Sequence, residues 1–429
     1  MQILLTMNKG SNRLFNTLLK VFLRLRHLFS VIVALCILLI SCSLFGDSNT
    51  DPATRWVGTW STAPQLVEPG NMPPEPGLSH NTLRQVVRVS LGGDSLRVRF
   101  TNEFSTSPVT LQAAQIAVSR GGSAIDASTV KELKFNGHPE VVMNPGIAIT
   151  SDPVSFGLEP RMDIAITIFF GETSPDVTGH PGSRTTSYLL AGNDTSVSDF
   201  SGSVPTDHWY MISGIDVKAP ERAAAVAILG NSITDGRGSG TNKQNRWPDI
   251  LSERLLNNPR TQYTAVLNLG IGGNCVLKNC LGPSAIDRFD RDILNQQGVR
   301  WVIILEAIND IGQTQDSIAA SQVAKDLMTA YGRMIDVAHA KDIEVYGATL
   351  LPFGKSFYYT GYRETARNTV NNWIRNSGRF DAVIDFDTVL RDPEDTLCLL
   401  PAVHSGDFLH PNEEGYKIMG EAVDLKLFR

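Results

Sequence analysis

The chain from residue 55 onward first alternates apolar and polar positions, which is the pattern of half-buried β-strands. Two such runs occur in "RQVVRVSLGGDSLRVRF", separated by Gly92-Gly93-Asp94-Ser95, which is typical of a hairpin turn. Further strand-like runs are "VTLQAAQIAVS", "DIAITIFFGE" and "HWYMISGIDV". No long amphipathic helical pattern interrupts them. We therefore predict a β-sandwich or jelly-roll-like module over residues 55–220.

The pattern changes after Pro220, where short apolar runs begin to alternate with helical periods. The runs are "AAAVAILG", "TAVLNLG", "WVIILEA", "IEVYGATLL" and "DAVIDF". The clearest helix has apolar residues on one face at Leu327, Met328, Tyr331, Met334, Ile335 and Ala338, and a second has them at Trp247, Ile250, Leu251 and Leu255. Strands that alternate with helices predict a parallel sheet covered on both faces. We therefore expect an α/β domain over residues 221–429.

The first 41 residues have the pattern of an export signal. Lys20, Arg24 and Arg26 precede the apolar run "LFSVIVALCILLIS", which is short for a membrane span. The run leads into "LISC", which resembles the lipobox of bacterial lipoproteins, and this resemblance implies that Cys42 is lipidated and becomes the mature N-terminus. Residues 42–54 would then form a tether from a lipid anchor in the membrane. An ordinary signal peptide and an uncleaved anchor are the alternatives.

Composition and cysteine content bear on the number of domains, on binding to nucleic acid and on the state of the cysteines. A chain of 429 residues, 42% hydrophobic and 19% charged, is long enough for two domains. Its net charge of −6 gives no reason to expect nucleic acid as a partner. Cys275 and Cys280 stand close together, and in an exported protein a disulfide between them is favoured over a zinc site, which needs more soft ligands. Cys398 is then left over as a buried thiol.

Candidate chemistry lies where the apolar runs end, because ligands of open α/β sheets bind at the carboxyl ends of the strands. The first run ends at Gly230-Asn231-Ser232, and the second ends in "NLGIGGN". The run "WVIILEA" leads into "IND" at residues 308–310, and Asp407 and His410 precede the last helical segment. The sheet would bring these four stretches to one edge.

These stretches hold the groups that ester hydrolysis needs: a nucleophile, a base and donors for the oxyanion. Ser232 stands at a strand-to-helix turn, where its hydroxyl can project from the edge of the sheet. His410 would take the serine proton and later return it to the leaving alcohol, while Asp407 would hold the other imidazole nitrogen. The N–H groups of Ser232 and Gly273 and the side-chain amide of Asn309 would form the oxyanion hole.

In this order and combination, the four stretches resemble the SGNH branch of the GDSL esterase and lipase family, whose marker residues fall on Ser232, Gly273, Asn309 and His410. The resemblance covers roughly residues 222–429. It implies a three-layer, flavodoxin-like α/β fold and a serine esterase that works through an acyl-enzyme without a metal or a cofactor. The segment from "RWVGTWSTAPQ" onward is similar, more loosely, to the β module upstream of this domain in some exported members.

Each assignment has an alternative. Ser232 could only cap a helix, and Asn309 could be an ordinary turn residue. His404 competes with His410 for the role of base. His404, Asp407 and His410 also form an H-x2-D-x2-H pattern that could bind a metal. We favour the esterase interpretation because a metal site would leave the serine and the oxyanion residues without a role.

Two positions depart from the family's pattern. The usual acid beside the serine is Asn231 here, and the usual glycine before "IND" is Ala307. Asparagine keeps the shape and an acceptor oxygen but removes a charge, so we expect Asn231→Asp to retain activity and mainly alter its pH dependence. This serine motif differs from the G-x-S-x-G motif of α/β-hydrolases, because Thr234 stands where that motif has its second glycine. Asp310 is expected to cap or brace its loop.

The sequence thus predicts an exported, lipid-anchored serine esterase at a bacterial membrane, in the periplasm or at the cell surface. An upstream β module on such an enzyme suits the removal of acetyl or other short acyl groups from polysaccharide, by analogy with family members. A lysophospholipase or other lipid esterase is the alternative within the enzyme class. An inactive glycan-binding lipoprotein is the alternative outside it.

Overall fold

The computed structural model describes residues 17–29, 31–33 and 53–429. Residues 17–29 and 31–33 are helical and exposed. Within the described ranges, no helix is both long and apolar enough to cross a bilayer. The lipobox residue Cys42 and the tether up to residue 52 lie outside the described residues. The export signal, the lipid anchor and the tether therefore stay predictions.

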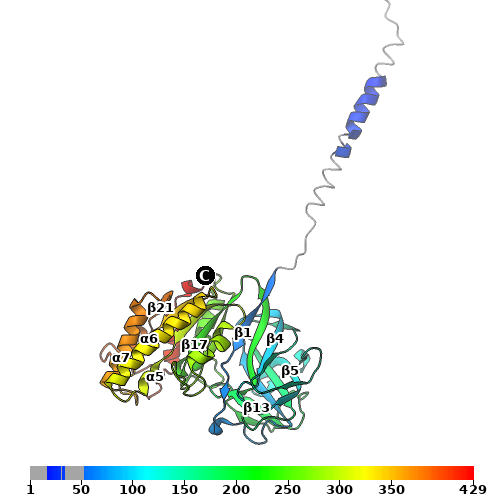
Figure 1. Cartoon of the computed structure of the whole chain (residues 1–429). Coiled ribbons are helices and arrows are strands. Elements are labelled where there is room, and N and C mark those ends of the chain that lie inside the picture. Colours follow the sequence, from blue (N-terminus) through cyan, green and yellow to red (C-terminus); the bar gives the residue numbers. More distant parts are fainter. Residues whose placement is uncertain (1–16, 30, 34–52) are drawn as a thin grey trace, which may run out of the picture. The chain divides into compact units, whose positions relative to one another are not determined.

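Residues Thr54–Arg429 form one compact unit, and its N-terminal region is built from antiparallel sheets (Figure 1). One sheet has the order β1-β16-β4-β10, with β9 also paired to β4; the strands are β1 (Thr54–Ser61), β16 (Ile212–Pro220), β4 (Gly93–Thr101), β10 (Val154–Leu158) and β9 (Ala148–Thr150). A small sheet contains β15 (Trp209–Tyr210), β12 (Thr178–His180) and β2 (Gln65–Leu66), in that order.

The largest antiparallel sheet has the order β14-β13-β3-β11-β5-β6, with β7 and β8 also paired to β5. Its strands are β14 (Val204–Thr206), β13 (Ser187–Ala191), β3 (Asn81–Arg88), β11 (Asp163–Phe170), β5 (Val109–Gly121), β6 (Ala124–Ile125), β7 (Lys131–Leu133) and β8 (Val141–Met143). The inner faces of this sheet and of the first one contribute to a common hydrophobic core. The predicted sandwich-like module is confirmed.

The two runs flanking Gly92 are strands, but they do not form the predicted hairpin. β3 pairs with β11 and β13, whereas β4 pairs with β16, β10 and β9. The chain passes from one sheet to the other because each strand buries one face in the shared core, through residues such as Leu83 and Leu96. Glycine is needed at the crossing, since a Cβ on Gly92 would lie 2.3 Å from the carbonyl oxygen of Leu158.

The C-terminal region contains the predicted parallel sheet, in the order β18-β17-β19-β20-β21. Its strands are β18 (Thr264–Gly270), β17 (Ala224–Gly230), β19 (Val299–Leu305), β20 (Glu344–Ala348) and β21 (Ala382–Ile384). On one face, α3 (Trp247–Leu256), α8 (Phe386–Leu390) and α9 (Glu413–Ala422) pack against residues such as Val226 and Ile228. On the other, α6 (Ser317–His339) and α7 (Gly361–Asn376) pack against Leu229 and Ile304 (Figure 1). This is the expected three-layer, flavodoxin-like arrangement.

The strand order reverses at β17, which is the point where open α/β sheets bind ligands. The chain runs from β17 to β18 on one side and then returns to β19 on the other. Ser232 follows β17, and α5 (Ile308–Gly312) follows β19. Both strands beside the reversal therefore end in the motifs that the sequence singled out.

The β-rich and α/β regions are continuous in their packing. The N–H of Gly58 on β1 donates to the carbonyl oxygen of Gln297 at 2.8 Å, and the N–H of Val266 on β18 donates to Ser90 Oγ at 3.3 Å. Buried residues from β1, β18 and α6 belong to the same hydrophobic core. The boundary at residues 220 and 221 stays a prediction about the sequence, because the packing does not break there.

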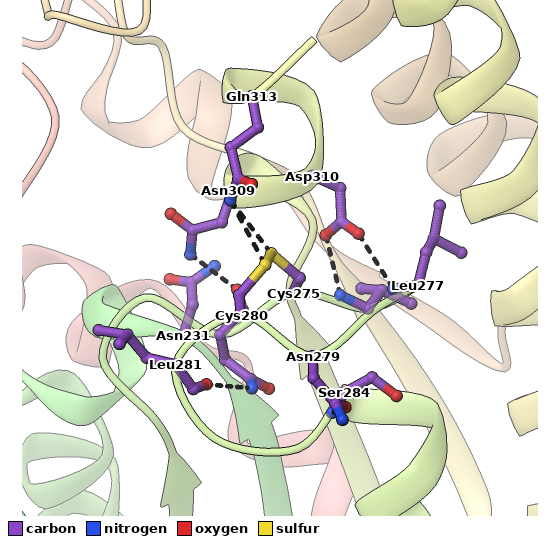
Figure 2. The surroundings of a disulfide bond; sticks show 12 residues. Asn231, Cys275, Leu277, Asn279, Cys280, Leu281, Ser284, Asn309, Asp310 and Gln313 are labelled. Carbon is purple, nitrogen blue, oxygen red and sulfur yellow. Dashed lines mark hydrogen bonds between the residues drawn. A yellow bond between two sulfur atoms is a disulfide. The ribbon is translucent and has the colours of Figure 1, made fainter. Parts of the chain in front are cut away.

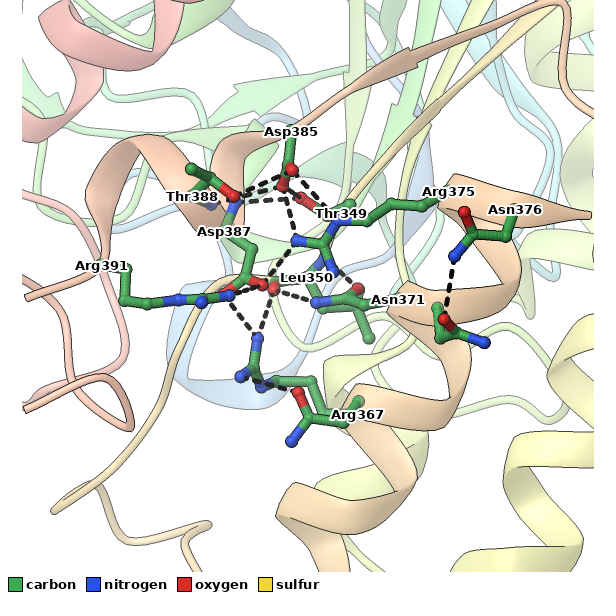
Figure 3. A network of polar contacts seen from close by, with 12 residues as sticks. Thr349, Leu350, Arg367, Asn371, Arg375, Asn376, Asp385, Asp387, Thr388 and Arg391 are labelled. Carbon is green, nitrogen blue, oxygen red and sulfur yellow. Dashed lines mark hydrogen bonds and ion pairs between the residues drawn. The ribbon is translucent and has the colours of Figure 1, made fainter. Parts of the chain in front are cut away.

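A charged network fixes the far edge of the parallel sheet, where α7 meets β21 and α8 (Figure 3). Arg367 and Arg375 each contact Asp387, at 2.8 Å and 2.7 Å, and Arg391 contacts the same carboxylate. Arg375 also reaches Asp385 at 2.7 Å. Each guanidinium in this network thus has a carboxylate partner, as buried charges require.

Candidate active site

The turn after β17 places Ser232 at the wall of a cavity while a neighbouring residue caps the helix. The side chain of Asn231 is the N-cap of α2 (Ser232–Asp235), and its Oδ1 accepts from the N–H of Ile233 at 3.1 Å. A Cβ on Gly230 would lie 2.2 Å from Thr234 Oγ1, so the tight turn needs glycine there. The capping role considered for Ser232 thus falls to Asn231, and the Ser232 hydroxyl is left for another partner.

That partner is His410, in the loop that precedes α9. Ser232 Oγ lies 2.8 Å from His410 Nε2, and His410 Nδ1 lies 2.6 Å from Asp407 Oδ2. Only 8% of Ser232 and 4% of His410 is exposed, so these hydrogen bonds are shielded from bulk water. Three residues that the sequence placed at one edge of the sheet are therefore in contact, in the order that proton transfer requires.

Burial and hydrogen bonds set the protonation states of Asp407 and His410. Burial by itself would raise the pKa of Asp407, but the N–H groups of His410 and Leu409 and the imidazole lower the pKa well below its usual range. Burial lowers the pKa of His410 below 6.5, although Asp407 opposes the shift. At neutral pH the site therefore contains a carboxylate and a neutral imidazole, and the imidazole can accept a proton from Ser232.

The candidate oxyanion donors line the same cavity as Ser232 and His410. Gly273, beyond the end of β18, has a φ of +71°, and a Cβ there would lie 2.7 Å from Leu281. Asn309 Nδ2 donates to the carbonyl oxygen of Asn274 at 2.7 Å, and Asn309 Oδ1 accepts from the Tyr358 hydroxyl at 3.0 Å. These two bonds fix which way the amide points and leave one amide hydrogen for the cavity.

A loop closed by a disulfide lies between Gly273 and Leu281, which both line the cavity (Figure 2). The predicted bond between Cys275 and Cys280 is present. Asp310 braces the loop, because its carboxylate accepts from the N–H groups of Val276 and Leu277 at 2.8 and 3.0 Å. Among the cysteines that the structure describes, Cys398 is free and buried, as expected.

Residues 228–418 match the model of the GDSL-like Lipase/Acylhydrolase family. This α/β region belongs to that family. It is therefore an ester-bond hydrolase, as the resemblance of its motifs implied. No curated protein matches the chain.

The chain is also similar, over part of its length, to several solved structures. A lipolytic protein of the G-D-S-L family from Desulfitobacterium hafniense DCB-2 is 25% identical, with 46% of this chain and 97% of that chain covered and a TM-score of 0.35. A family member from Veillonella parvula DSM 2008 is 24% identical, with 47% and 96% covered and a TM-score of 0.35. A catalytic mutant of an acetylxylan esterase from Geobacillus stearothermophilus is 18% identical, with 47% and 93% covered and a TM-score of 0.36.

Asn231, which stands where the family usually has an acid, contacts Glu306 in the GDSL-like region. Asn231 Nδ2 donates to Glu306 Oε2 at 3.1 Å, and the N–H of Ala307 donates to the same oxygen at 2.8 Å. Burial raises the pKa of Glu306 to about 8. An acid at position 231 would put a second carboxyl group beside this one, so the two would share a proton at neutral pH. The expected pH effect of Asn231→Asp stays a prediction, now with Glu306 as its cause.

Ala307, the second departure from the family pattern, has a left-handed backbone. Its φ is +110°, a conformation that L side chains adopt at a cost and that glycine adopts freely. The methyl group therefore matters through the backbone conformation rather than through steric crowding alone. The sequence shows only that alanine replaces the usual glycine, and the dihedral angle shows where the cost arises.

Much of the cavity wall comes from the β-rich region, which sequence reasoning missed. The cavity has a volume of about 460 Å³. Beside the GDSL-like residues it is lined from the β-rich side by Gln65, Glu68, Asn71, Pro181, Gly182, Arg184 and His208. These residues lie in short strands and loops without a chemical motif, so no local pattern marked them.

Sequence reasoning also missed Arg288, a fully buried side chain that ties the strand ends together. It donates to the carbonyl oxygens of Leu269 and Gly230 at 2.7 and 3.1 Å, and to Asn274 Oδ1 at 3.0 Å. It thereby links β17, β18 and the residue that positions Asn309. We assign it a positioning role.

His404, the alternative candidate for the base, contacts other groups than Ser232. His404 Nδ1 accepts from the N–H of Gly406 at 3.0 Å, and its ring packs on Phe408 with centroids 4.4 Å apart. Both ring nitrogens of His410 are occupied by Ser232 and Asp407. Within the described part of the chain, no group of three or more His, Cys, Asp or Glu side chains is arranged to hold a metal ion.

Proposed function

We propose that this ester hydrolase is a serine esterase that acts through Ser232, His410 and Asp407 and removes acetyl or other short acyl groups from carbohydrate. The observation that carries the proposal is the chain of short hydrogen bonds from Asp407 through His410 to Ser232, which ends in the cavity beside Gly273 and Asn309. A helix-capping serine would need no histidine partner.

The reaction follows from these contacts. Ser232 Oγ attacks the carbonyl carbon of the ester while His410 Nε2 takes its proton, and Asp407 stabilises the imidazolium that forms. The negative oxygen of the tetrahedral intermediate accepts from the N–H groups of Ser232 and Gly273 and from Asn309 Nδ2. His410 then gives the proton to the alcohol oxygen, the alcohol leaves, and the acyl group stays on Ser232. A water molecule, activated by His410, hydrolyses this acyl-enzyme and restores the serine.

Two features of the cavity support a carbohydrate on the alcohol side. Gln65, Asn71 and His208 offer amide and imidazole groups that match sugar hydroxyls. At the same cavity, Phe357 is 71% exposed and its ring lies 4.4 Å from that of Tyr358, centroid to centroid. Exposed aromatic rings beside convergent polar groups are typical of a binding site for a ligand with one apolar face.

A second candidate, a lipid ester, is favoured by one observation. A more apolar groove of about 400 Å³ shares Glu68 and Leu281 with the cavity and is also lined by Leu66, Val67 and Phe104. An acyl chain could extend along it. The third interpretation, an inactive glycan-binding lipoprotein, does not fit an ester hydrolase whose serine, histidine and aspartate are in contact.

We also propose that the protein is exported and held at a bacterial membrane by a lipid on Cys42. The basic and apolar segment that ends in "LISC" and the disulfide between Cys275 and Cys280 support an oxidising compartment. The test is fractionation of cells that express the wild type and Cys42→Ala. The wild type should be in the membrane fraction and the variant should not; equal distribution would contradict the anchor.

The substrate is tested with 4-nitrophenyl esters of increasing acyl length and with acetylated xylan oligosaccharides, using the full-length protein and Ser232→Ala. Activity highest on acetate, together with acetate release from the oligosaccharides, would support deacetylation. A kcat/KM that rises with acyl length would favour the lipid ester instead. If the wild type is as inactive as Ser232→Ala on every ester, the serine esterase proposal is wrong.

A further inference from the structure

Two arginine side chains line the active-site cavity from opposite regions of the molecule. Arg184 lies between β12 and β13 in the β-rich region. Arg237 follows α2, five residues after Ser232, in the GDSL-like region. Both are close enough to the reacting groups that their charges help to lower the pKa of His410, after the larger effect of burial. Two positive charges thus face the place where the ester is cleaved.

Neither guanidinium is neutralised by the protein. In the part of the chain that the structure describes, Arg184 and Arg237 have no ion-pair or side-chain hydrogen-bond partner, and Arg184 Nε is buried without one. The charged network beside α7 is the opposite case, since Arg367, Arg375 and Arg391 all contact carboxylates there (Figure 3). A buried donor without a partner is costly, and a ligand can supply the missing acceptor.

The acidic side chains that line the cavity contact polar groups of the protein. Glu68 accepts from Gln65 Nε2 at 2.6 Å and from Asn71 Nδ2 at 3.0 Å. Asp235 Oδ1 lies 3.0 Å from Nε2 of the buried His180, whereas Asp235 Oδ2 is buried without a hydrogen-bond partner. Arg184 and Arg237 are the cationic groups that an anionic ligand in this cavity would meet.

The backbone at Arg184 is also held in an uncommon conformation. Its φ is +51°, in the left-handed region, and its carbonyl oxygen accepts from the N–H of Asn242 at 2.9 Å. A strained residue that the surroundings hold in place is a common feature of ligand-binding sites. Here the strain belongs to the same residue whose side chain lacks a partner.

We propose that Arg184 and Arg237 bind a carboxylate on the alcohol part of the substrate, so that the preferred substrates are acyl esters of acidic carbohydrate, such as glycans that contain uronic acid. The guanidinium group forms paired hydrogen bonds with a planar carboxylate, which suits this role. The inference rests on the proposed esterase function and adds to it the charge class of the substrate. A phosphate, as in a lipid headgroup, is the other anion that this chemistry could bind.

The test compares two esters that differ by one charge, 3-acetoxybenzoate and its methyl ester. For the full-length wild type we expect a higher kcat/KM on the charged ester. In Arg184→Ala and Arg237→Ala, the ratio of kcat/KM for the charged ester over the neutral one should fall about 10-fold or more, mainly through KM. Arg184→Lys should restore part of the ratio because it keeps the charge. The exposed Arg260→Ala, outside the cavity, is the matched control and should keep the wild-type ratio.

Competition then identifies the anion. Glucuronate should inhibit hydrolysis of the charged ester by the wild type, with a weaker effect on both alanine variants. Inhibition by glycerol 3-phosphate without inhibition by glucuronate would overturn the assignment to a carboxylate. A ratio that is unchanged in folded Arg184→Ala and Arg237→Ala would overturn the inference while leaving the esterase intact. Failure of the wild type to hydrolyse the neutral ester would instead contradict the proposed function itself.

Discussion

The two sides of the active-site cavity are built in different ways. On the GDSL-like side, Ser232, Gly273 and Asn309 follow the carboxyl ends of parallel strands, and hydrogen bonds of 2.6 to 3.1 Å fix the side chains around them. On the β-rich side, residues such as Gln65 and Arg184 lie in short strands and loops. We infer a division of work: the groups that follow the parallel strands break the ester bond, and the β-rich side, together with Arg237, selects which ester enters.

This comparison makes a general prediction about mutations. Changes to the reacting groups of the GDSL-like side, Ser232, His410 and Asn309, should alter kcat for every ester, because they act on the reacting atoms. Changes on the β-rich side should alter the ratio of kcat/KM between two esters, because they act on the part of the substrate that does not react. The substitutions below probe this difference in order of decreasing effect.

The largest effect is expected from His410→Ala. The neutral imidazole takes the proton of Ser232, so its removal should lower kcat by about 10⁴- to 10⁶-fold on charged and neutral esters alike. Steady-state hydrolysis of 4-nitrophenyl acetate measures this. His404→Ala is the control, since His404 is engaged with Gly406 and Phe408, and it should stay close to the wild type. A comparable loss in His404→Ala would mean that the base has been misassigned.

The next effect concerns the oxyanion. Asn309→Ala should lower kcat by about 100- to 1000-fold with little change in KM, because the amide is proposed to stabilise charge that develops only in the transition state. Tyr358→Phe, which removes the bond to Asn309 Oδ1, should produce a smaller loss of the same kind. If Asn309→Ala raised KM and left kcat intact, Asn309 would belong to substrate binding, and the two sides would not differ as proposed.

The α/β domain and the meeting of Ser232, His410 and Asp407 at one edge of its sheet could be predicted because their causes are local, while the catalytic roles of these residues stay predictions. Apolar runs that alternate with helices determine the parallel sheet, and Ser232 and Asn309 stand where those runs stop. The β-rich region was harder, because which strand pairs with which depends on contacts distant in sequence. The alternation around Gly92 correctly predicted two strands, but their partners are set by the core they share, and the hairpin was wrong. Gln65, Arg184 and His208 line the cavity only through this packing.

A further effect links pH to stability through Glu306. Its pKa is raised from 4.5 to about 8 in the folded protein, so the folded state binds the proton more tightly than the unfolded state does. Its contribution to stability is therefore fully present below pH 4.5 and is lost as the pH rises to about 8.

Over that range the wild type should lose roughly 2–5 kcal/mol of unfolding free energy relative to Glu306→Gln, by the pKa shift. Urea unfolding at pH 5 and pH 8.5 measures this. The exposed Glu253→Gln is the control and should show no such difference. Parallel pH curves for the wild type and Glu306→Gln would show that the carboxyl group is not held protonated.

The smallest effect is expected at Ala307. Glycine adopts a φ of +110° freely, so Ala307→Gly should stabilise the protein by about 1 kcal/mol, less the entropy that glycine adds to the unfolded chain. Thermal unfolding measures this, with Ala227→Gly in the middle of β17 as a control that should be destabilised. A loss of stability in Ala307→Gly would mean that the methyl group packs more favourably than its backbone conformation suggests.

The central claim is that Ser232, activated by His410, is the nucleophile in the cavity that both regions line. The most direct measurement is labelling of the full-length protein with a fluorophosphonate, followed by peptide mass spectrometry and an assay of residual activity. We predict one adduct on the peptide that contains Ser232, formed in parallel with the loss of esterase activity, and none in Ser232→Ala or His410→Ala over the same time. Inactivation with the adduct on another residue, or esterase activity that survives full modification of Ser232, would contradict the account.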